Sequence, residues 1–259
     1  MAPEPTKNSP RAFTLIELLV VISVLAIVLG LLMPTLVMVR SMARGSACIS
    51  NVRQLETAFS AYALDNHGMM MVNSQLPPTG GVKWWFGWTS KTTGIERDLD
   101  LTKGLISPYL GANIPTKIQC PDFAYRQGTY TPKFAVYAAS YGLNKFLSPL
   151  EIEKRAVRCV TVKRPARTVV FADGVQQDFS IVYYNEPFYL GIDSGNPAYG
   201  GFVHFRHKGL ANVCFLDGHV ETVSVKDSFI IHPNVGGYPA GNFTSGATDS
   251  NTLYGDPRF

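Results

Sequence analysis

The feature that most constrains this chain is a long apolar run, residues 13–39, that contains one charged residue, Glu17. As a single helix, rising 1.5 Å per residue, the run would be about 40 Å long, enough to cross a hydrocarbon layer of about 30 Å. A carboxylate inside such a layer costs about 2.5–3.5 kcal/mol on insertion scales. We therefore expect Glu17 to have a partner that offsets this cost.

A positively charged partner arises if the chain is cut after Ala12. Phe13 would then carry a free amine, four residues before Glu17. That amine would lie close to the carboxylate of its own chain or to that of a neighbouring subunit. The residues before the run are mostly polar, so residues 1–12 are expected to form a short leader.

The order Arg11, Ala12, Phe13, Thr-Leu-Ile and Glu17 resembles the cleavage and methylation signal of type IV prepilins and type II secretion pseudopilins. The resemblance implies that a prepilin peptidase cuts before Phe13 and methylates the new amine. It also implies that Glu17 helps to place the subunit among other pilin-like subunits of a filament. The N-terminus would lie in the cytoplasm, the helix in the inner membrane and the head outside the cytoplasm. The departure is Ala12, where the family usually has glycine.

Two other interpretations of the apolar run stay open. A cleaved secretory signal has an apolar stretch of about 7–15 residues closed by a small-residue site, and this run is longer and lacks such a site. A plain signal anchor explains the run, but it explains neither Glu17 nor the register of Glu17 with Ala12 and Phe13. Positive charges lie on both sides of the run, so charge alone does not set its orientation.

The composition of the remainder fits a folded domain. The chain has 259 residues, with 46% hydrophobic and 16% charged residues, which excludes a disordered protein. About 220 residues remain after the leader and the run, enough for one large domain. The net charge is only +4 and the basic residues are scattered, so no nucleic-acid partner is indicated.

The helix is expected to continue beyond the apolar run. Cys48, Val52, Leu55, Phe59 and Tyr62 follow one another at spacings of 4, 3, 4 and 3 residues. These spacings place the five side chains on one face of an amphipathic helix. The pattern predicts one helix of about 50 residues, of which the second half is buried along this face.

Other residues of the expected helix define its irregularities and its end. Pro34 lacks an N–H group and should kink the helix locally. Arg53, Gln54 and Glu56 are expected to lie off the buried face. Gly68 suits a left-handed cap, so the helix should end just before it.

The four cysteines, Cys48, Cys120, Cys159 and Cys214, show no Cys-x-x-Cys spacing of a metal or redox site. An exported head can form disulfides, and four cysteines allow three full pairings. Cys48 and Cys214 lie at expected core positions of a helix and a strand. This favours a bond between Cys120 and Cys159.

Short strands are expected at residues 134–141, 168–172, 180–184, 211–216 and 219–225. The last two flank Asp217-Gly218, which predicts a two-residue type I′ hairpin, and Asp173-Gly174 indicates a second turn. A long helix followed by antiparallel strands is an α+β arrangement. The predicted fold is pilin-like, with the N-terminal helix packed against an antiparallel sheet in a head with large insertions.

The chain is therefore divided into five segments. They are a leader at 1–12, a transmembrane half-helix at 13–39, an amphipathic half-helix at 40–67, an α+β head at 68–235 and a loosely ordered tail at 236–259.

A second resemblance concerns the head. His207 is followed by nine residues and then by Asp217-Gly218. With residues 119–122, 140–144 and 170–174, this spacing resembles the H-X9-DG group of prepilin-type proteins, also called the DUF1559 family. That group is named by these features and not by an activity. The resemblance therefore implies a family and no ligand.

His207, Asp217 and His219 are candidate metal ligands, because His and Asp bind metals. Their spacing matches no ligand motif, and Asp217 with Gly218 already suits a turn. We favour a structural interpretation, in which His207 hydrogen-bonds across the mouth of the hairpin. Major pseudopilins hold calcium through loop oxygens, which residues 191–196 could supply. Apart from such an ion, no cofactor is expected.

The sequence shows no motif of a hydrolase, a metalloprotease or a phosphate-binding enzyme, and no convincing acid pair. Trp84, Trp85 and Trp88 can form a platform for sugar stacking, although such a cluster more often belongs to a core. We therefore expect a non-enzymatic pilin-like subunit of a type II secretion or type IV pilus-like structure. The alternative is a membrane-anchored module that binds polysaccharide.

Overall fold

The computed structural model describes residues 13–90, 97–123, 132–145, 147, 157–178, 183–185, 189–193, 196–224, 230–235 and 238–242. The chain divides into two compact units, Met1–Ala43 and Arg44–Phe259. One helix, α1 (Leu15–Asp65), passes through both and contains Pro34 without a break in its assignment. It is the one helix among the described residues that is long and apolar enough to cross a membrane.

The second half of α1 is buried along the predicted face. Cys48, Val52, Leu55 and Phe59 are fully buried and Tyr62 is half-buried, so the periodicity is confirmed. Glu56 is also buried, contrary to expectation, because the head covers more of the helix than the apolar stripe.

The predicted end of α1 is also confirmed. Gly68 has φ +79° and its N–H donates to the carbonyl oxygen of Ala63 at 2.8 Å. This left-handed residue closes the last turn of the helix, as a C-terminal glycine cap does.

The head contains two sheets. The smaller is antiparallel, in the order β1 (Ser74–Gln75), β2 (Val82–Trp84) and β3 (Gly87–Thr89). The larger follows the order β10-β9-β5-β4-β7-β8-β12-β11, with β6 paired to β5. Its strands are β4 (Tyr141–Asn144), β5 (Val169–Asp178), β6 (Tyr183–Asn185), β7 (Tyr189–Asp193), β8 (Asn196–His204), β9 (Leu210–Phe215), β10 (Val220–Ser224), β11 (Ile230–Val235) and β12 (Tyr238–Asn242). The pairings within the larger sheet are antiparallel except for β4 with β7.

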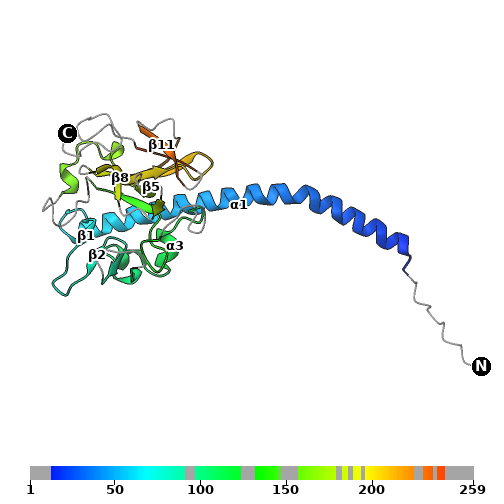
Figure 1. Cartoon of the computed structure of the whole chain (residues 1–259), viewed down its shortest axis with the longest axis horizontal. Coiled ribbons are helices and arrows are strands. Elements are labelled where there is room, and N and C mark those ends of the chain that lie inside the picture. Colours follow the sequence, from blue (N-terminus) through cyan, green and yellow to red (C-terminus); the bar gives the residue numbers. More distant parts are fainter. Residues whose placement is uncertain are drawn as a thin grey trace, which may run out of the picture. The chain divides into compact units, whose positions relative to one another are not determined.

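Short helices connect these strands. They are η1 (Leu101–Lys103), α2 (Ser107–Leu110), α3 (Ile114–Ile118), η3 (Cys159–Thr161) and η4 (Pro165–Arg167). In Figure 1 the cyan end of α1 runs between the larger sheet and the part of the head that holds β1, β2 and α3. Helix and antiparallel sheets together confirm the α+β, pilin-like fold.

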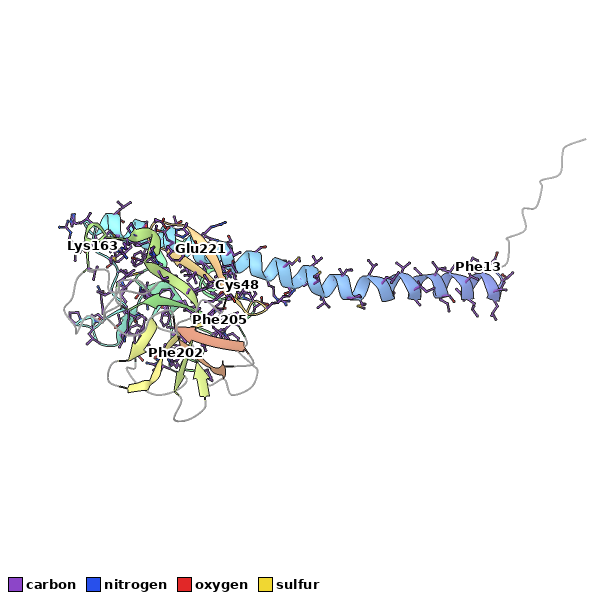
Figure 2. The ribbon with its side chains drawn as sticks, turned by 90° about the horizontal axis from the view of Figure 1, so that it is seen from above. Phe13, Cys48, Lys163, Phe202, Phe205 and Glu221 are labelled. Atoms are coloured by element: carbon purple, nitrogen blue, oxygen red, sulfur yellow. A yellow bond between two sulfur atoms is a disulfide. The ribbon has the colours of Figure 1, made fainter. Side chains whose placement is uncertain are left out.

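The buried apolar residues form two clusters. The larger joins the inner face of α1 to the sheet, and Phe59 meets Phe171 of β5 edge to face at 5.9 Å between ring centroids. The smaller includes Val169, Val213 and Phe215. Phe202 belongs to the first cluster and Phe205 to the second (Figure 2). Both layers of the head therefore depend on β5 and its neighbours.

Several strand predictions need correction. Strands β9 and β10 lie where expected, but residues 134–140 are not a strand, and Phe134 makes only an isolated bridge with Arg97. The turn predicted at Asp173-Gly174 is wrong, because both residues lie inside β5. Asp173 pairs with Tyr141 of β4 and Gly174 with Val203 of β8. Pairing with β4 and β8 keeps the chain extended there.

The hairpin between β9 and β10 has a longer loop than predicted. The N–H of Phe215 donates to the His219 carbonyl and the N–H of Gly218 donates to the Phe215 carbonyl, each at 3.0 Å. Gly218 has φ +90°, whereas Asp217 is not among the described residues with positive φ. The loop is therefore the three-residue type, a turn closed by a left-handed glycine, and not type I′.

The disulfide joins Cys48 to Cys120, with 5.5 Å between their Cα atoms. The predicted bond between Cys120 and Cys159 is wrong, and Cys159 and Cys214 are free thiols. The buried face of α1 lies against the loop after α3, which carries Cys120. Cys48 is therefore buried in the core and disulfide-bonded at the same position.

Within the predicted tail, residues 238–242 form β12, which pairs with β8 and β11. These five residues are ordered as an inner strand of the sheet, contrary to the expected loose tail. The other residues of the segment 236–259 lie outside the described part of the chain. The same is true of residues 180–182 of the predicted third strand.

Candidate functional sites

The first candidate site is the start of α1. The backbone N–H and the hydroxyl of Thr14 both donate to Oε2 of Glu17, at 2.8 and 2.7 Å. The N–H of Glu17 donates back to the Thr14 hydroxyl at 3.3 Å. This reciprocal pair is a capping box, which satisfies N–H groups that a helix start leaves without partners. Sequence reasoning missed this role of Glu17, although the spacing Thr-x-x-Glu is its usual signal.

The surface around Glu17 is apolar and open. Phe13 is 72% exposed, and the large apolar side chains between Leu15 and Val39 are also exposed. The predicted processing residues Arg11 and Ala12 lie outside the described residues. The site therefore presents a capped helix start followed by an uncovered apolar surface.

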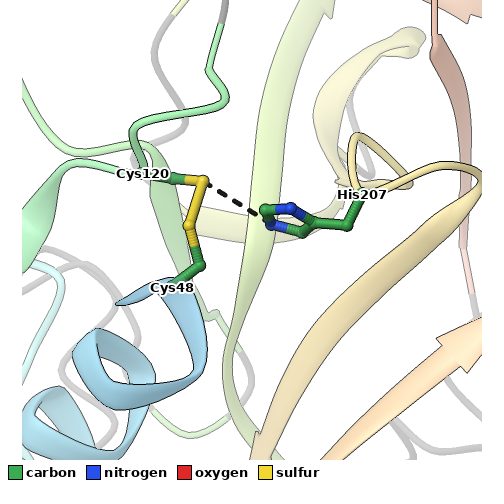
Figure 3. A group of neighbouring side chains, drawn as sticks. All are labelled: Cys48, Cys120 and His207. Atoms are coloured by element: carbon green, nitrogen blue, oxygen red, sulfur yellow. Dashed lines mark hydrogen bonds between the residues drawn. A yellow bond between two sulfur atoms is a disulfide. The ribbon is translucent and has the colours of Figure 1, made fainter. Parts of the chain in front are cut away.

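The second candidate site is a buried ionic cluster in the head, centred on His207. Its Nδ1 lies 3.0 Å from Oδ2 of Asp122, and its Nε2 lies 3.1 Å from Oδ2 of Asp173. Nε2 also lies 3.6 Å from Sγ of Cys120, in the disulfide with Cys48 (Figure 3). Each ring nitrogen of His207 therefore faces a carboxylate oxygen at hydrogen-bond distance.

Each carboxylate in this cluster also has a positive neighbour. Asp122 pairs with Arg44 of α1, and Asp173 lies 3.9 Å from Nε of the buried Arg206. The N–H of Asn212 also donates to Asp173 at 2.7 Å. Burial by itself would raise the pKa of Asp173, but Arg206, His207 and the Asn212 N–H together hold it below its usual value.

Four separate segments build the cluster. Asp122 follows α3, Asp173 lies inside β5, and Arg206 and His207 lie in the turn after β8. That turn is fixed by hydrogen bonds in both directions between the backbones of His207 and Leu210, at 3.0 and 3.1 Å. Arg206 donates to the Ser140 carbonyl oxygen at 3.0 Å, which ties residue 140 to the same place. The recurring segments that the sequence singled out therefore meet around one histidine.

The predicted metal set of His207, Asp217 and His219 is not brought together. Asp217 and His219 contact each other at 2.5 Å in the loop between β9 and β10, away from the bonds of His207. His207 does not reach across that hairpin, so its predicted hydrogen bond there is wrong. Among the described residues, the one group of three potential ligands within 4.8 Å is Cys48, Cys120 and His207.

The Asp-Gly end of the H-X9-DG spacing lies against α1. A Cβ atom on Gly218 would lie 3.4 Å from Oε2 of Glu56, so the loop lies against the helix, and the φ of +90° at this residue favours glycine. The pKa of Glu56 is raised, chiefly by burial of its carboxyl group and also by the charge of Asp217. The hydroxyl of Ser60, which donates to Glu56 at 2.6 Å, partly lowers the pKa again. The loop therefore covers a carboxyl group of the helix.

The tryptophan cluster belongs largely to the core. Trp85 is fully buried and lies 5.3 Å from Phe171 and 5.2 Å from Phe86, between ring centroids. Trp84 and Trp88 are half-buried. Because its central ring is covered, the cluster is not a flat platform for sugars.

The loop proposed for calcium is described only in part. Residues 191–193 end β7 and residue 196 begins β8, with Asp193 paired to Asn196. Residues 194 and 195 lie outside the described part of the chain. Calcium at this loop stays a prediction.

Comparison with protein families found the prokaryotic N-terminal methylation motif at residues 7–33. This match covers the predicted cleavage site, Phe13 and Glu17, and it confirms the prepilin-type signal. With the apolar helix, it supports a pilin-like subunit that is processed at its N-terminus and anchored in a membrane by a single span. No curated protein and no solved structure matched the chain.

Proposed function

We propose that the chain is a non-enzymatic pilin-like subunit, cut between Ala12 and Phe13 and methylated on the new amine of Phe13. A prepilin peptidase and methyltransferase would carry out both steps. The processed helix would then join other pilin-like subunits in a type II secretion or type IV pilus-like structure. The N-terminus would lie in the cytoplasm, the span in the inner membrane and the head outside the cytoplasm.

The observation that carries this proposal is that three features coincide at the same residues. The methylation motif spans the start of α1, the apolar side chains that follow are exposed, and Glu17 lies in the first turn of the helix. The capping contacts occupy Oε2 and the backbone N–H of Glu17, and none of them uses Oε1. A second oxygen can thus receive the methylated amine of a neighbouring subunit, which would neutralise the carboxylate within the membrane.

We also assign the head to the H-X9-DG group. The support is structural, because residues 119–122, 140–144, 170–174 and the His207 turn all contribute to the same cluster. Arg206 and His207 bind Ser140, Asp122 and Asp173, one residue from each of these segments. Segments that are far apart in the sequence and typical of this group therefore contact one another in the fold, as expected if they are kept for a common structural role.

The test has two parts, both on the full chain in its membrane. Mass spectrometry of the mature N-terminus should find N-methylated Phe13; an intact leader would refute processing. Crosslinking in the membrane should then give multimers that disappear in Glu17→Ala.

Two matched variants separate assembly from helix capping. Glu17→Gln keeps a side-chain oxygen for Thr14 but removes the charge, so it should be processed and should not assemble. Thr14→Val removes the hydroxyl but keeps Glu17, so it should still assemble. Multimers that persist in both glutamate variants would overturn the assembly role.

A further inference from the structure

The disulfide and His207 form a group with the composition of a metal site. Cys48 and Cys120 offer two sulfurs and His207 offers Nε2, all within 4.8 Å of one another (Figure 3). We propose that the reduced cysteine pair and His207 bind one zinc ion, and that the disulfide is the metal-free form of the same site. This proposal does not depend on the proposed function.

The spacings of the ligand atoms support it. In tetrahedral zinc sites, bonds of about 2.3 Å to sulfur and 2.0–2.1 Å to nitrogen place these ligands about 3.5–3.6 Å apart. Sγ of Cys120 and Nε2 of His207 are 3.6 Å apart. These three ligands leave the fourth tetrahedral position to water, as zinc sites with three protein ligands do. The two sulfurs, bonded in the disulfide, would separate to about 3.8 Å in the zinc-bound form.

The other ring nitrogen of His207 is already held as zinc-bound histidines usually are. Nδ1 lies 3.0 Å from Asp122, and a carboxylate there fixes the ring and leaves Nε2 to face the metal. Arg44 in turn holds Asp122. Asp122 and Arg44 therefore give His207 the carboxylate support that zinc-bound histidines usually have.

The charges also balance. The charges of Arg44 and Arg206 balance those of Asp122 and Asp173. Zinc adds two positive charges and the two thiolates add two negative charges. The loaded cluster is neutral, which suits a buried site.

The two forms are related by a defined reaction. Zinc binding to the reduced site releases the two thiol protons. Closure of the disulfide releases zinc, forms the bond between Cys48 and Cys120, and passes two electrons to the disulfide of a thiol–disulfide exchange partner, which takes up two protons from water and becomes two thiols. Cys120 lines an open groove of about 530 Å³, which gives such a partner and the ion a route to the pair.

The test uses the full chain in detergent, reduced with a phosphine and freed of metal. Cobalt should bind at one ion per chain with a thiolate charge-transfer band, and zinc should displace it. His207→Gln should weaken binding at least tenfold, and Asp122→Asn should weaken it about 10–100-fold. Cys159→Ala and Cys214→Ala are matched controls that should bind as the wild type does.

A second measurement needs no variant at the site. Zinc should slow alkylation of Cys48 and Cys120 in the reduced wild-type chain and leave Cys159 unaffected, as mass spectrometry of the modified peptides would show. No cobalt band, equal protection of Cys159, or full affinity in His207→Gln would overturn the proposal. A failed titration would leave the processing result at Phe13 untouched.

Discussion

Removal of the disulfide should strongly destabilise the head. The perturbation is the double substitution Cys48→Ala and Cys120→Ala, because alanine leaves neither a free thiol nor a buried hydroxyl. The bond closes a loop with a sequence separation of 72 residues. In the chain-entropy model a loop of this length contributes about 4.4 kcal/mol to the free energy of unfolding.

The assay is thermal unfolding of the full chain in detergent, followed by near-ultraviolet circular dichroism with a metal chelator present. For a unit of this size, about 4.4 kcal/mol corresponds to a fall in Tm of about 9–18 °C. Reduction of the wild type should lower its Tm to the same value. The matched control, Cys159→Ala, should keep the wild-type response to reduction.

Two results would refute this reasoning. A double variant that loses less than about 1 kcal/mol would show that the bond hardly constrains the unfolded chain. Peptide mapping of the oxidised protein that finds Cys120 joined to Cys159 would restore the pairing favoured by the sequence.

Four further substitutions test the packing and the buried charges. Trp85→Ala should lower the free energy of unfolding by about 3–5 kcal/mol and Trp88→Ala by less, and equal losses in thermal unfolding would contradict the core assignment. Glu56→Gln should stabilise the head at pH values above about 4.3, the pKa of an unfolded glutamate. The reason is that the pKa of Glu56 is raised in the folded head, so its charged form opposes folding. A gain in stability that is the same from pH 3 to pH 8 would contradict this. Asp173→Asn should cost about 3–5 kcal/mol near pH 7, because it leaves the charge of the buried Arg206 without its carboxylate partner. Because the pKa of Asp173 is lowered in the folded head, its contribution to stability is complete above about pH 3.9 and is lost as the pH falls through the folded pKa. The wild type and Asp173→Asn should therefore become closer in stability in acid. A difference in stability that stays constant into acid would contradict the role given to Asp173.

The part of the fold that the sequence predicts well is the part set by local pattern. The apolar run and the spacing from Cys48 to Tyr62 both follow the period of a helix, and Gly68 provides the local stop. The segments at β9 and β10 follow the period of a strand in the same way. Each of these patterns is complete within one segment, so no distant contact is needed to interpret it.

The disulfide could not be predicted on that basis. Cys48 was assigned to a helix core, and a core position appeared to exclude a bond. In the folded head the same position faces the loop that carries Cys120, so burial and bonding coincide. Which loop covers a given helix face depends on the order of the whole sheet, and no pattern around Cys48 records it.

The ionic cluster was missed for a related reason. Asp173 precedes a glycine, and Asp-Gly usually indicates a turn. Here β4 and β8 pair along that part of the chain and keep it extended. The carboxylate then points at His207 and Arg206, which lie more than 30 residues later. The sequence suggested a family resemblance for this segment, but the role of Asp173 depends on contacts between segments.

The structure gives a physical reason for the nine residues between His207 and Asp217. His207 lies beside the disulfide of Cys48, and the loop at Gly218 lies against Glu56, so both ends of the spacing contact α1. Strand β9 between them has six residues, about 17 Å long at 3.4 Å per residue. Cys48 and Glu56 are eight residues apart on the helix, which is about 12 Å at 1.5 Å per residue.

Near each of its ends β9 therefore has a neighbour that contacts the same helix, His207 beside Cys48 and Gly218 beside Glu56. A spacing one residue shorter or longer would turn the side chains of β9 to the opposite face of the sheet. It would also move either the histidine away from the disulfide or the glycine away from Glu56. The fixed distance between histidine and Asp-Gly is therefore a property of how the strand fits the helix. It requires no ligand at Asp217, whose own contacts are with His219 in the loop.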